Sequence, residues 1–168
     1  MRYVKTVIVA MTAALFAAPA MAQTAEPLEQ FRDWGAYKAE TEGGPVCYAL
    51  TQPTSMAPEG VNRGDVFLFV TSRPNQGVHE EVSIITGYPY AEGQTASAEI
   101  DDETFTLMTE DDGAWVENAA EEERLVEAMR DGITMTVRGT SQRGTDTTDQ
   151  YSLLGLTAAL EHVTEVCE

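Results

Sequence analysis

Hydrophobic and polar residues alternate in short runs along most of the chain, which is the pattern of half-buried β-strands. In the clearest run, Ile133, Met135 and Val137 are expected to face a core, with polar residues between them. Within residues 65–73, the positions from Val66 to Val70 are all apolar, as in a central strand buried on both faces. Further strands are expected at 31–40, 46–52, 80–86, 95–100, 104–108 and 114–116. Such short, regularly spaced strands predict an all-β sandwich or barrel, of which we favour an immunoglobulin-like sandwich.

Two segments have helical periodicity instead. Asn118 is expected to cap the first helix, Glu121 to reach back to the cap, and Gly132 to end it. The glutamates at 121–123 complement the positive end of the helix dipole and are expected to lie in water. This short internal helix has the apolar stripe Leu125, Val126 and Met129. The second, C-terminal helix, at 156–167, carries Leu156, Leu160, Val163 and Cys167 on one face, so both helices should pack on the sheet.

The first residues have the order of a secretory signal peptide. Arg2 and Lys5 precede an apolar run at 7–18 and the small residues Ala20 and Ala22, so cleavage is expected before Gln23. No later apolar run reaches the roughly 18 residues that a membrane-spanning helix needs. We therefore predict a signal peptide at 1–22, a flexible leader at 23–30, a single domain at 31–168, and a periplasmic or secreted location.

The chain is strongly acidic. Without Arg2 and Lys5, 8 basic and 28 acidic residues remain, which is a formal charge of −20. Such a surface repels nucleic acid and anionic lipid head groups, and it suits cationic partners or simply solubility in a salty medium. Nucleic acid is therefore excluded as a partner.

Cys47 and Cys167 are the only cysteines. In an oxidising compartment an intramolecular disulfide is expected, because the chain has no Cys-x-x-Cys motif and no nearby cation to activate a thiol. Closing so long a loop is worth about 4 to 5 kcal/mol in the chain-entropy model. An intermolecular bridge or a reactive thiol are the alternatives.

Catalytic and metal-binding motifs are weak. His79 and His162 have no neighbouring nucleophile motif, Gly-x-Ser-x-Gly is absent, and both histidines are expected at the surface. The cysteines and histidines are scattered, and the acidic turns at 101–103 and 110–113 lack the spacing of a calcium loop. We predict no catalytic residues, no metal and no cofactor.

The segment 138–155 begins like a phosphate-binding loop. Gly139 and Gly144 have the required spacing, but Thr145 and Asp146 stand where lysine and serine are needed. We interpret the segment as a hairpin with a long turn, in which Asp149 is partly buried beside Tyr151 and Leu153 and needs a partner. Arg143 is the expected partner, with the hydroxyls of Thr140, Ser141 and Thr147 as alternatives.

The aromatic residues divide into core and contact candidates. Trp34 and Trp115 lie in apolar strand patterns and are expected in the core. Tyr88 and Tyr90, in the Gly-Tyr-Pro-Tyr corner, are better candidates for an exposed contact. Because loops on a rigid scaffold usually carry recognition, Gln142 and Arg143 in the long turn are further candidates.

The mature sequence resembles the invasion-associated locus B proteins of Gram-negative bacteria over nearly its whole length. The most specific segment is 139–155, in which Gly139, Ser141, Arg143, Gly144, Asp149, Tyr151 and Gly155 form the motif. It is followed by Leu-Thr-Ala-Ala-Leu and the terminal Cys167. The remaining residues that carry the resemblance are Asp33-Trp34, Val46-Cys47-Tyr48, Gly87-Tyr88-Pro89, Ala114-Trp115 and Ala128-Met129-Arg130 before Gly132.

The resemblance implies a periplasmic or secreted β-sandwich with a disulfide and no established catalytic residues. In pathogens, members of this family are linked to entry into host cells. Lys38 stands where some members have a further cysteine, so a second disulfide is not expected.

We therefore expect an exported, non-enzymatic binding or envelope-associated protein, with a role in cell-surface or host-cell interaction. Its partner is expected to be a protein or another envelope component. The alternative is a small hydrolase that acts on envelope or extracellular glycans through paired carboxylates. A purely structural or stress-protective role is the third reading.

Overall fold

A computed structural model describes residues 25–167. The predicted signal peptide lies outside these residues. The described part of the chain contains eleven strands, two α-helices and one short 3-10 helix, η1 (Pro74–Gln76). The strands are β1 (Glu26–Phe31), β2 (Trp34–Thr41), β3 (Gly44–Thr51), β4 (Ser55–Ala57), β5 (Phe67–Arg73), β6 (Val78–Ile85), β7 (Ala96–Ile100), β8 (Glu103–Glu110), β9 (Gly113–Trp115), β10 (Thr134–Thr140) and β11 (Asp146–Ser152). The helices are α1 (Ala119–Asp131) and α2 (Leu156–Cys167).

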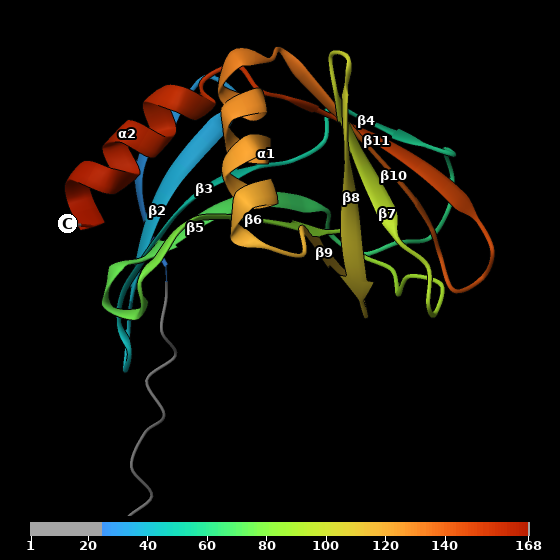
Figure 1. The fold of residues 1–168 in the computed structure, drawn as a ribbon, viewed down its shortest axis with the longest axis horizontal. Coiled ribbons are helices and arrows are strands. Elements are labelled where there is room, and N and C mark those ends of the chain that lie inside the picture. Colours follow the sequence, from blue (N-terminus) through green and yellow to red (C-terminus); the bar gives the residue numbers. More distant parts are fainter. Residues whose placement is uncertain (1–24, 168) are drawn as a thin grey trace, which may run out of the picture.

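Neighbouring strands are antiparallel and follow the order β1-β2-β3-β5-β6-β9-β8-β7-β10-β11-β4. Figure 1 shows β2, β3, β5 and β6 on one side of the molecule and β7, β8, β10 and β11 on the other. The short strand β9 joins these two halves, because it pairs with β6 and with β8. The predicted class is confirmed: the fold is an all-β, sandwich-like fold with two helices and one disulfide.

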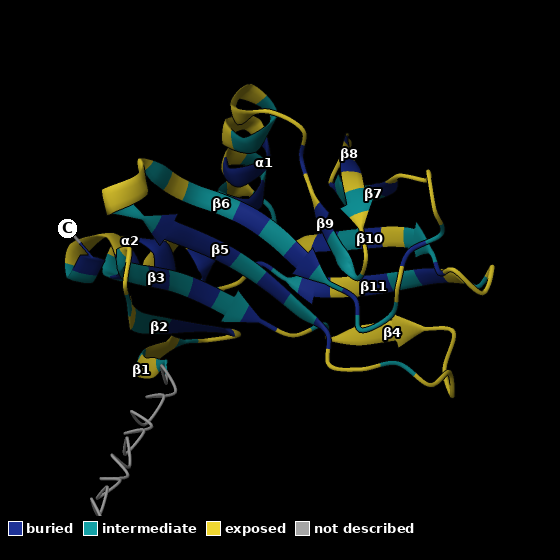
Figure 2. Cartoon of the chain, turned by 90° about the horizontal axis from the view of Figure 1, so that it is seen from below, coloured by how far each residue is buried: buried dark blue, intermediate teal, exposed yellow. Residues whose placement is uncertain are grey.

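The hydrophobic core lies between the sheet and the helices. Figure 2, which colours each residue by burial, shows α2 behind β3 and β5 and α1 beyond the edge of β6, with buried positions alternating along these strands. As predicted, both helices turn their apolar stripes inward. The largest fully buried side chains include Trp34, Leu68, Ile84, Phe105, Leu125, Met129, Met135, Tyr151, Leu156 and Leu160.

The disulfide between Cys47 and Cys167 is confirmed. It joins β3 to the end of α2, with a Cα–Cα distance of 6.0 Å. Cys47 faces α2 together with Ala36 and packs against Val163, in a small apolar cluster beside the main core. The bond therefore fastens the C-terminal helix to the sheet.

Two predictions about strand positions were wrong. Residues 26–30 of the expected flexible leader instead belong to β1, which pairs with β2 at the edge of the sheet. Ile133 was expected to face the core but is 66% exposed. It lies between the end of α1 and the start of β10, where the alternation that buries Met135 and Val137 has not yet begun.

Candidate functional site

The hairpin β10–β11 presents a tight turn at one end of the sandwich. Within the turn, the Ser141 amide donates to the Thr145 carbonyl at 2.9 Å, and the Gly144 amide donates to the Ser141 carbonyl at 2.8 Å. The Gln142 amide donates to the Pro89 carbonyl at 2.8 Å, which ties the turn to the neighbouring corner. Gly144 has a φ of +78°, a left-handed conformation that favours glycine. Gln142 and Arg143 are exposed at the tip of this braced turn.

Arg143 is not the partner of Asp149, as had been predicted. Asp149 is 1% exposed and pairs with Arg63, which lies 86 residues earlier in the loop before β5. The guanidinium donates from Nη1 to Oδ1 at 2.9 Å and from Nη2 to Oδ2 at 2.5 Å, so the pair is bidentate. Arg63 Nε also donates to the Thr86 carbonyl at 3.0 Å. The ion pair therefore ties the loop before β5 and the end of β6 to β11.

The Gly-Tyr-Pro-Tyr corner packs against the same ion pair. Tyr88 is half-buried, shares a 2.5 Å hydrogen bond with the Thr147 hydroxyl, and lies under the Arg63 guanidinium at 5.0 Å from its ring centre. Tyr90 is only 6% exposed, so the prediction that it offers an exposed contact was wrong. Tyr151 is also fully buried, and burial raises the pKa of its phenol.

At two glycines of the motif, neighbouring atoms lie so close to the backbone that a larger residue would not fit. A Cβ atom on Gly139 would come within 2.5 Å of the Tyr90 ring. Gly155 has a φ of +101°, and a Cβ there would overlap the backbone carbonyl of Phe31. The motif at 139–155 therefore forms a buried frame under the turn, in which Asp149, Tyr151 and the two glycines have structural roles. Arg143 and Asp146 are the exposed charged residues of this segment.

A second feature, a groove between β6 and α1, was not predicted. It encloses about 930 Å³. It is lined by apolar Val78 and Val126 and by the glutamates Glu80, Glu81, Glu117, Glu122, Glu123 and Glu127. Trp115 also lines it and is 36% exposed, so the prediction that this residue belongs to the core was wrong.

Glu122 is the unusual carboxylate of the groove. It was expected in water, but it is half-buried and accepts a 2.7 Å hydrogen bond from the Val82 amide of β6. Burial raises the pKa of Glu122 to about 7; the Val82 hydrogen bond opposes this increase, and the nearby charge of Glu81 adds to it.

The cap of α1 is at Asn118, as predicted, and its Oδ1 accepts hydrogen bonds from the Ala120 and Glu121 amides at 3.1 Å. The Glu121 carboxylate instead bonds Arg124.

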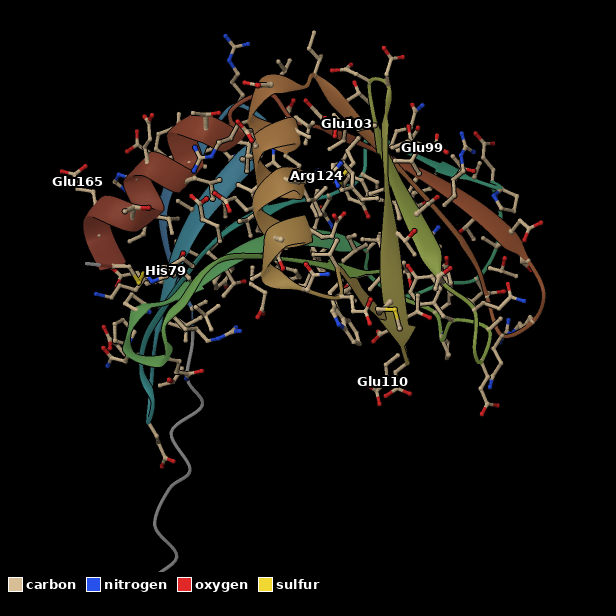
Figure 3. The ribbon with its side chains drawn as sticks, in the orientation of Figure 1. His79, Glu99, Glu103, Glu110, Arg124 and Glu165 are labelled. Atoms are coloured by element: carbon tan, nitrogen blue, oxygen red, sulfur yellow. A yellow bond between two sulfur atoms is a disulfide. The ribbon has the colours of Figure 1, made fainter. Side chains whose placement is uncertain are left out.

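The histidines do not belong to a metal-binding cluster within residues 25–167. Figure 3 shows His79 at the start of β6, where it is exposed at the rim of the groove. His162 is half-buried and lies 5.4 Å from the Phe31 ring, measured between ring centres. The two histidines therefore belong to different faces, and the described residues include no group of three or more His, Cys, Asp or Glu side chains arranged to hold a metal.

Most basic side chains in residues 25–167 are held in ion pairs. Figure 3 shows one of them, Arg124 of α1, which reaches Glu103 of β8 at 3.0 Å. The others pair Lys38 with Glu40, Arg63 with Asp149, Arg73 with Glu81, Arg130 with Glu80 and Arg138 with Glu99. In this part of the chain, only Arg32 and Arg143 have no carboxylate within ion-pair distance, so Arg143 at the turn tip is an available cation on an acidic molecule.

The fold and the buried frame define a class of small, disulfide-linked, sandwich-like β-proteins. Residues 34–164 match the model of the invasion associated locus B (IalB) protein family. The chain belongs to this family. No curated protein and no solved structure matches the chain with significance. No helix among the described residues is long and apolar enough to cross a membrane.

Proposed function

We propose that this protein is an exported, non-enzymatic binding protein of the cell envelope, which contacts a partner protein or another envelope component through the turn at 141–144. The observation that carries the proposal is the contrast in burial between two parts of the hairpin. Asp149 and Tyr151 are buried beneath the turn, whereas Gln142 and Arg143 are exposed at its tip.

A braced turn is well suited to recognition. Ordering a flexible loop on binding costs conformational entropy, whereas a turn that is already held by hydrogen bonds avoids most of this cost. Arg143 offers a planar group of donors that can engage a carboxylate or phosphate in a bidentate manner, and it has no competing ion pair in the described part of the chain. The expected contact is therefore an anionic or polar group on the partner.

Export is supported by the signal-peptide pattern and by the disulfide, which is typical of an oxidising compartment. The mature protein is expected to begin at Gln23. Mass spectrometry of the protein recovered from the periplasm or the culture medium tests this directly. Recovery of the intact 168-residue chain in the cytoplasm would contradict export.

Photo-crosslinking in living cells tests the contact surface. A photoreactive amino acid at Gln142 is compared with the same probe at Glu165, which lies on the exposed side of α2 (Figure 3). We expect a reproducible adduct from the first position that is absent from the second. Equal capture, or no capture, at the two positions would remove the turn as a contact surface.

A further inference from the structure

One edge of β6 has no strand beside it over most of its length. β6 pairs with β5 on one side, but β9 pairs with it on the other side only at Ile84 and Ile85. After Trp115 the chain turns away towards α1, so the backbone at 81–83 has no neighbouring strand on this side within residues 25–167. At Glu80, where φ is +52°, β6 is irregular and the amide donates to the Ser72 hydroxyl of β5. An open strand edge presents unpaired backbone groups that can pair with an added strand.

The Val82 amide shows how this edge is closed in the free protein. It faces the groove and donates to the Glu122 carboxylate of α1 instead of to a strand carbonyl. A carboxylate is a replaceable acceptor in this position, because the carbonyl of an incoming peptide can accept the same hydrogen bond. The groove thus contains a strand edge that is capped by one side chain.

The charge of the groove specifies what can enter it. Of its glutamates, Glu80 is in an ion pair with Arg130 and Glu81 with Arg73. The other four, Glu117, Glu122, Glu123 and Glu127, have no basic partner within residues 25–167. Trp115 at one end exposes part of its indole, and the face of an indole attracts lysine and arginine cations.

We propose that the groove between α1 and the open edge of β6 binds an extended, lysine- or arginine-containing segment of a partner protein, which pairs with β6 as an added strand. Main-chain hydrogen bonds to β6 give affinity in this mode of recognition, and alternate side chains give specificity. One side of the bound segment faces the glutamates of α1, and a basic side chain at its end lies against Trp115. Binding displaces Glu122 from Val82 and leaves its carboxylate beside the incoming cations. This surface is separate from the turn at 141–144 and goes beyond the function proposed above.

Titration with a short synthetic peptide that alternates lysine and valine tests this inference. Binding to the full mature protein is measured by calorimetry and by the fluorescence of Trp115. Three control ligands separate the possible causes of binding: the same peptide with N-methylated backbone amides, a peptide that alternates glutamate and valine, and spermine. We expect the lysine peptide to bind, and the N-methylated peptide and spermine to bind roughly tenfold more weakly or not at all.

Charge reversal locates the site. Glu123→Lys and Glu127→Lys, at exposed positions of the groove, are expected to weaken peptide binding by roughly tenfold together. The matched control is Glu165→Lys on α2. It changes the net charge as much as either single groove substitution does, and it is expected to leave peptide binding unchanged. Arg143→Glu should also leave it unchanged, which distinguishes this surface from the turn. The inference is overturned if the lysine peptide does not bind at low salt, if spermine or the N-methylated peptide binds equally well, or if Glu165→Lys has the same effect as the groove substitutions.

Discussion

Arg63 and Asp149, which lie 86 positions apart in the sequence, form a bidentate ion pair at the buried end of the sandwich. Their side chains are 7% and 1% exposed. Burial lowers the pKa of the Arg63 guanidinium, but the hydrogen bonds and the charge of Asp149 more than offset this effect and raise it. Arg63 therefore stays charged inside the fold, where the hydrogen-bonded Asp149 side chain compensates its charge.

Removal of either partner is expected to destabilise the protein strongly. Asp149→Ala or Arg63→Ala leaves an uncompensated buried charge, which costs about 3 to 5 kcal/mol of the free energy of unfolding. Urea denaturation of each variant measures this loss. Arg143→Ala is the control, because Arg143 is exposed and outside the pair, and it is expected to leave the free energy of unfolding unchanged. A loss on Arg143→Ala equal to that of Arg63→Ala would contradict the assignment of the partner.

The disulfide is expected to supply a large part of the stability. It closes a loop with a sequence separation of 120, for which the chain-entropy model gives about 4 to 5 kcal/mol. The double variant Cys47→Ala/Cys167→Ala should therefore melt well below the oxidised protein, and reducing agent should lower the melting temperature of the wild type but not of the variant. Equal melting temperatures of oxidised and reduced wild type would show that α2 is held by packing alone.

The two tryptophans are expected to differ sharply in their contribution to stability. Trp34 is fully buried and donates from its indole to the Ser152 carbonyl at 3.0 Å, so Trp34→Ala should cost about 3 to 5 kcal/mol. Trp115→Ala should cost much less, because this side chain lies at the surface of the groove. Chemical denaturation of the two variants compares them directly. Similar losses would place Trp115 in the core after all.

Glu122 is expected to make stability depend on pH. Burial raises its pKa from 4.5 to about 7 in the folded protein, so between these values the folded state keeps a proton that the unfolded chain releases. The contribution of Glu122 to the free energy of unfolding therefore falls as the pH rises from about 4.5 to about 7. Glu122→Gln removes this titration and retains an acceptor for the Val82 amide.

Unfolding of the wild type and of Glu122→Gln should thus be compared at pH 5 and pH 8. We expect the variant to gain stability relative to the wild type at the higher pH. Glu123→Gln, at the exposed neighbouring position, is the control and should follow the wild-type pH profile. A constant difference between Glu122→Gln and the wild type at the two pH values would contradict the raised pKa.

Most of the strands, both helices and the disulfide were predictable because they depend on local periodicity or on the cysteine count, whereas β1 and β4 were not predicted. The alternation that buries Met135 and Val137 and the cap at Asn118 are properties of a few neighbouring residues. The same rule explains Trp115: Ala114 and Val116 are buried, so the residue between them points outward. Trp115 was nevertheless expected in the core, because its two neighbours in the sequence are apolar as well.

The candidate sites were less predictable because they depend on contacts between distant segments. The motif indicated that Asp149 is buried and needs a partner, but Arg143 was chosen because it is near in sequence, whereas the fold brings Arg63 to the site. Glu122 looked like a solvent-exposed residue of an acidic helix. Its partner, the Val82 amide, is not bonded to a neighbouring strand because β9 pairs with β6 only at Ile84 and Ile85, which the sequence of α1 does not reveal.

Capture through the probe at Gln142, with and without Arg143, shows whether the exposed arginine of the turn makes the contact. The crosslinking experiment is repeated in an Arg143→Glu background, in which the buried frame beneath the turn is unchanged. We expect the adduct seen with Arg143 to disappear in this background, while the melting temperature of the purified protein stays the same. An adduct of equal yield in both backgrounds would contradict the claim that the exposed arginine of the braced turn makes the contact.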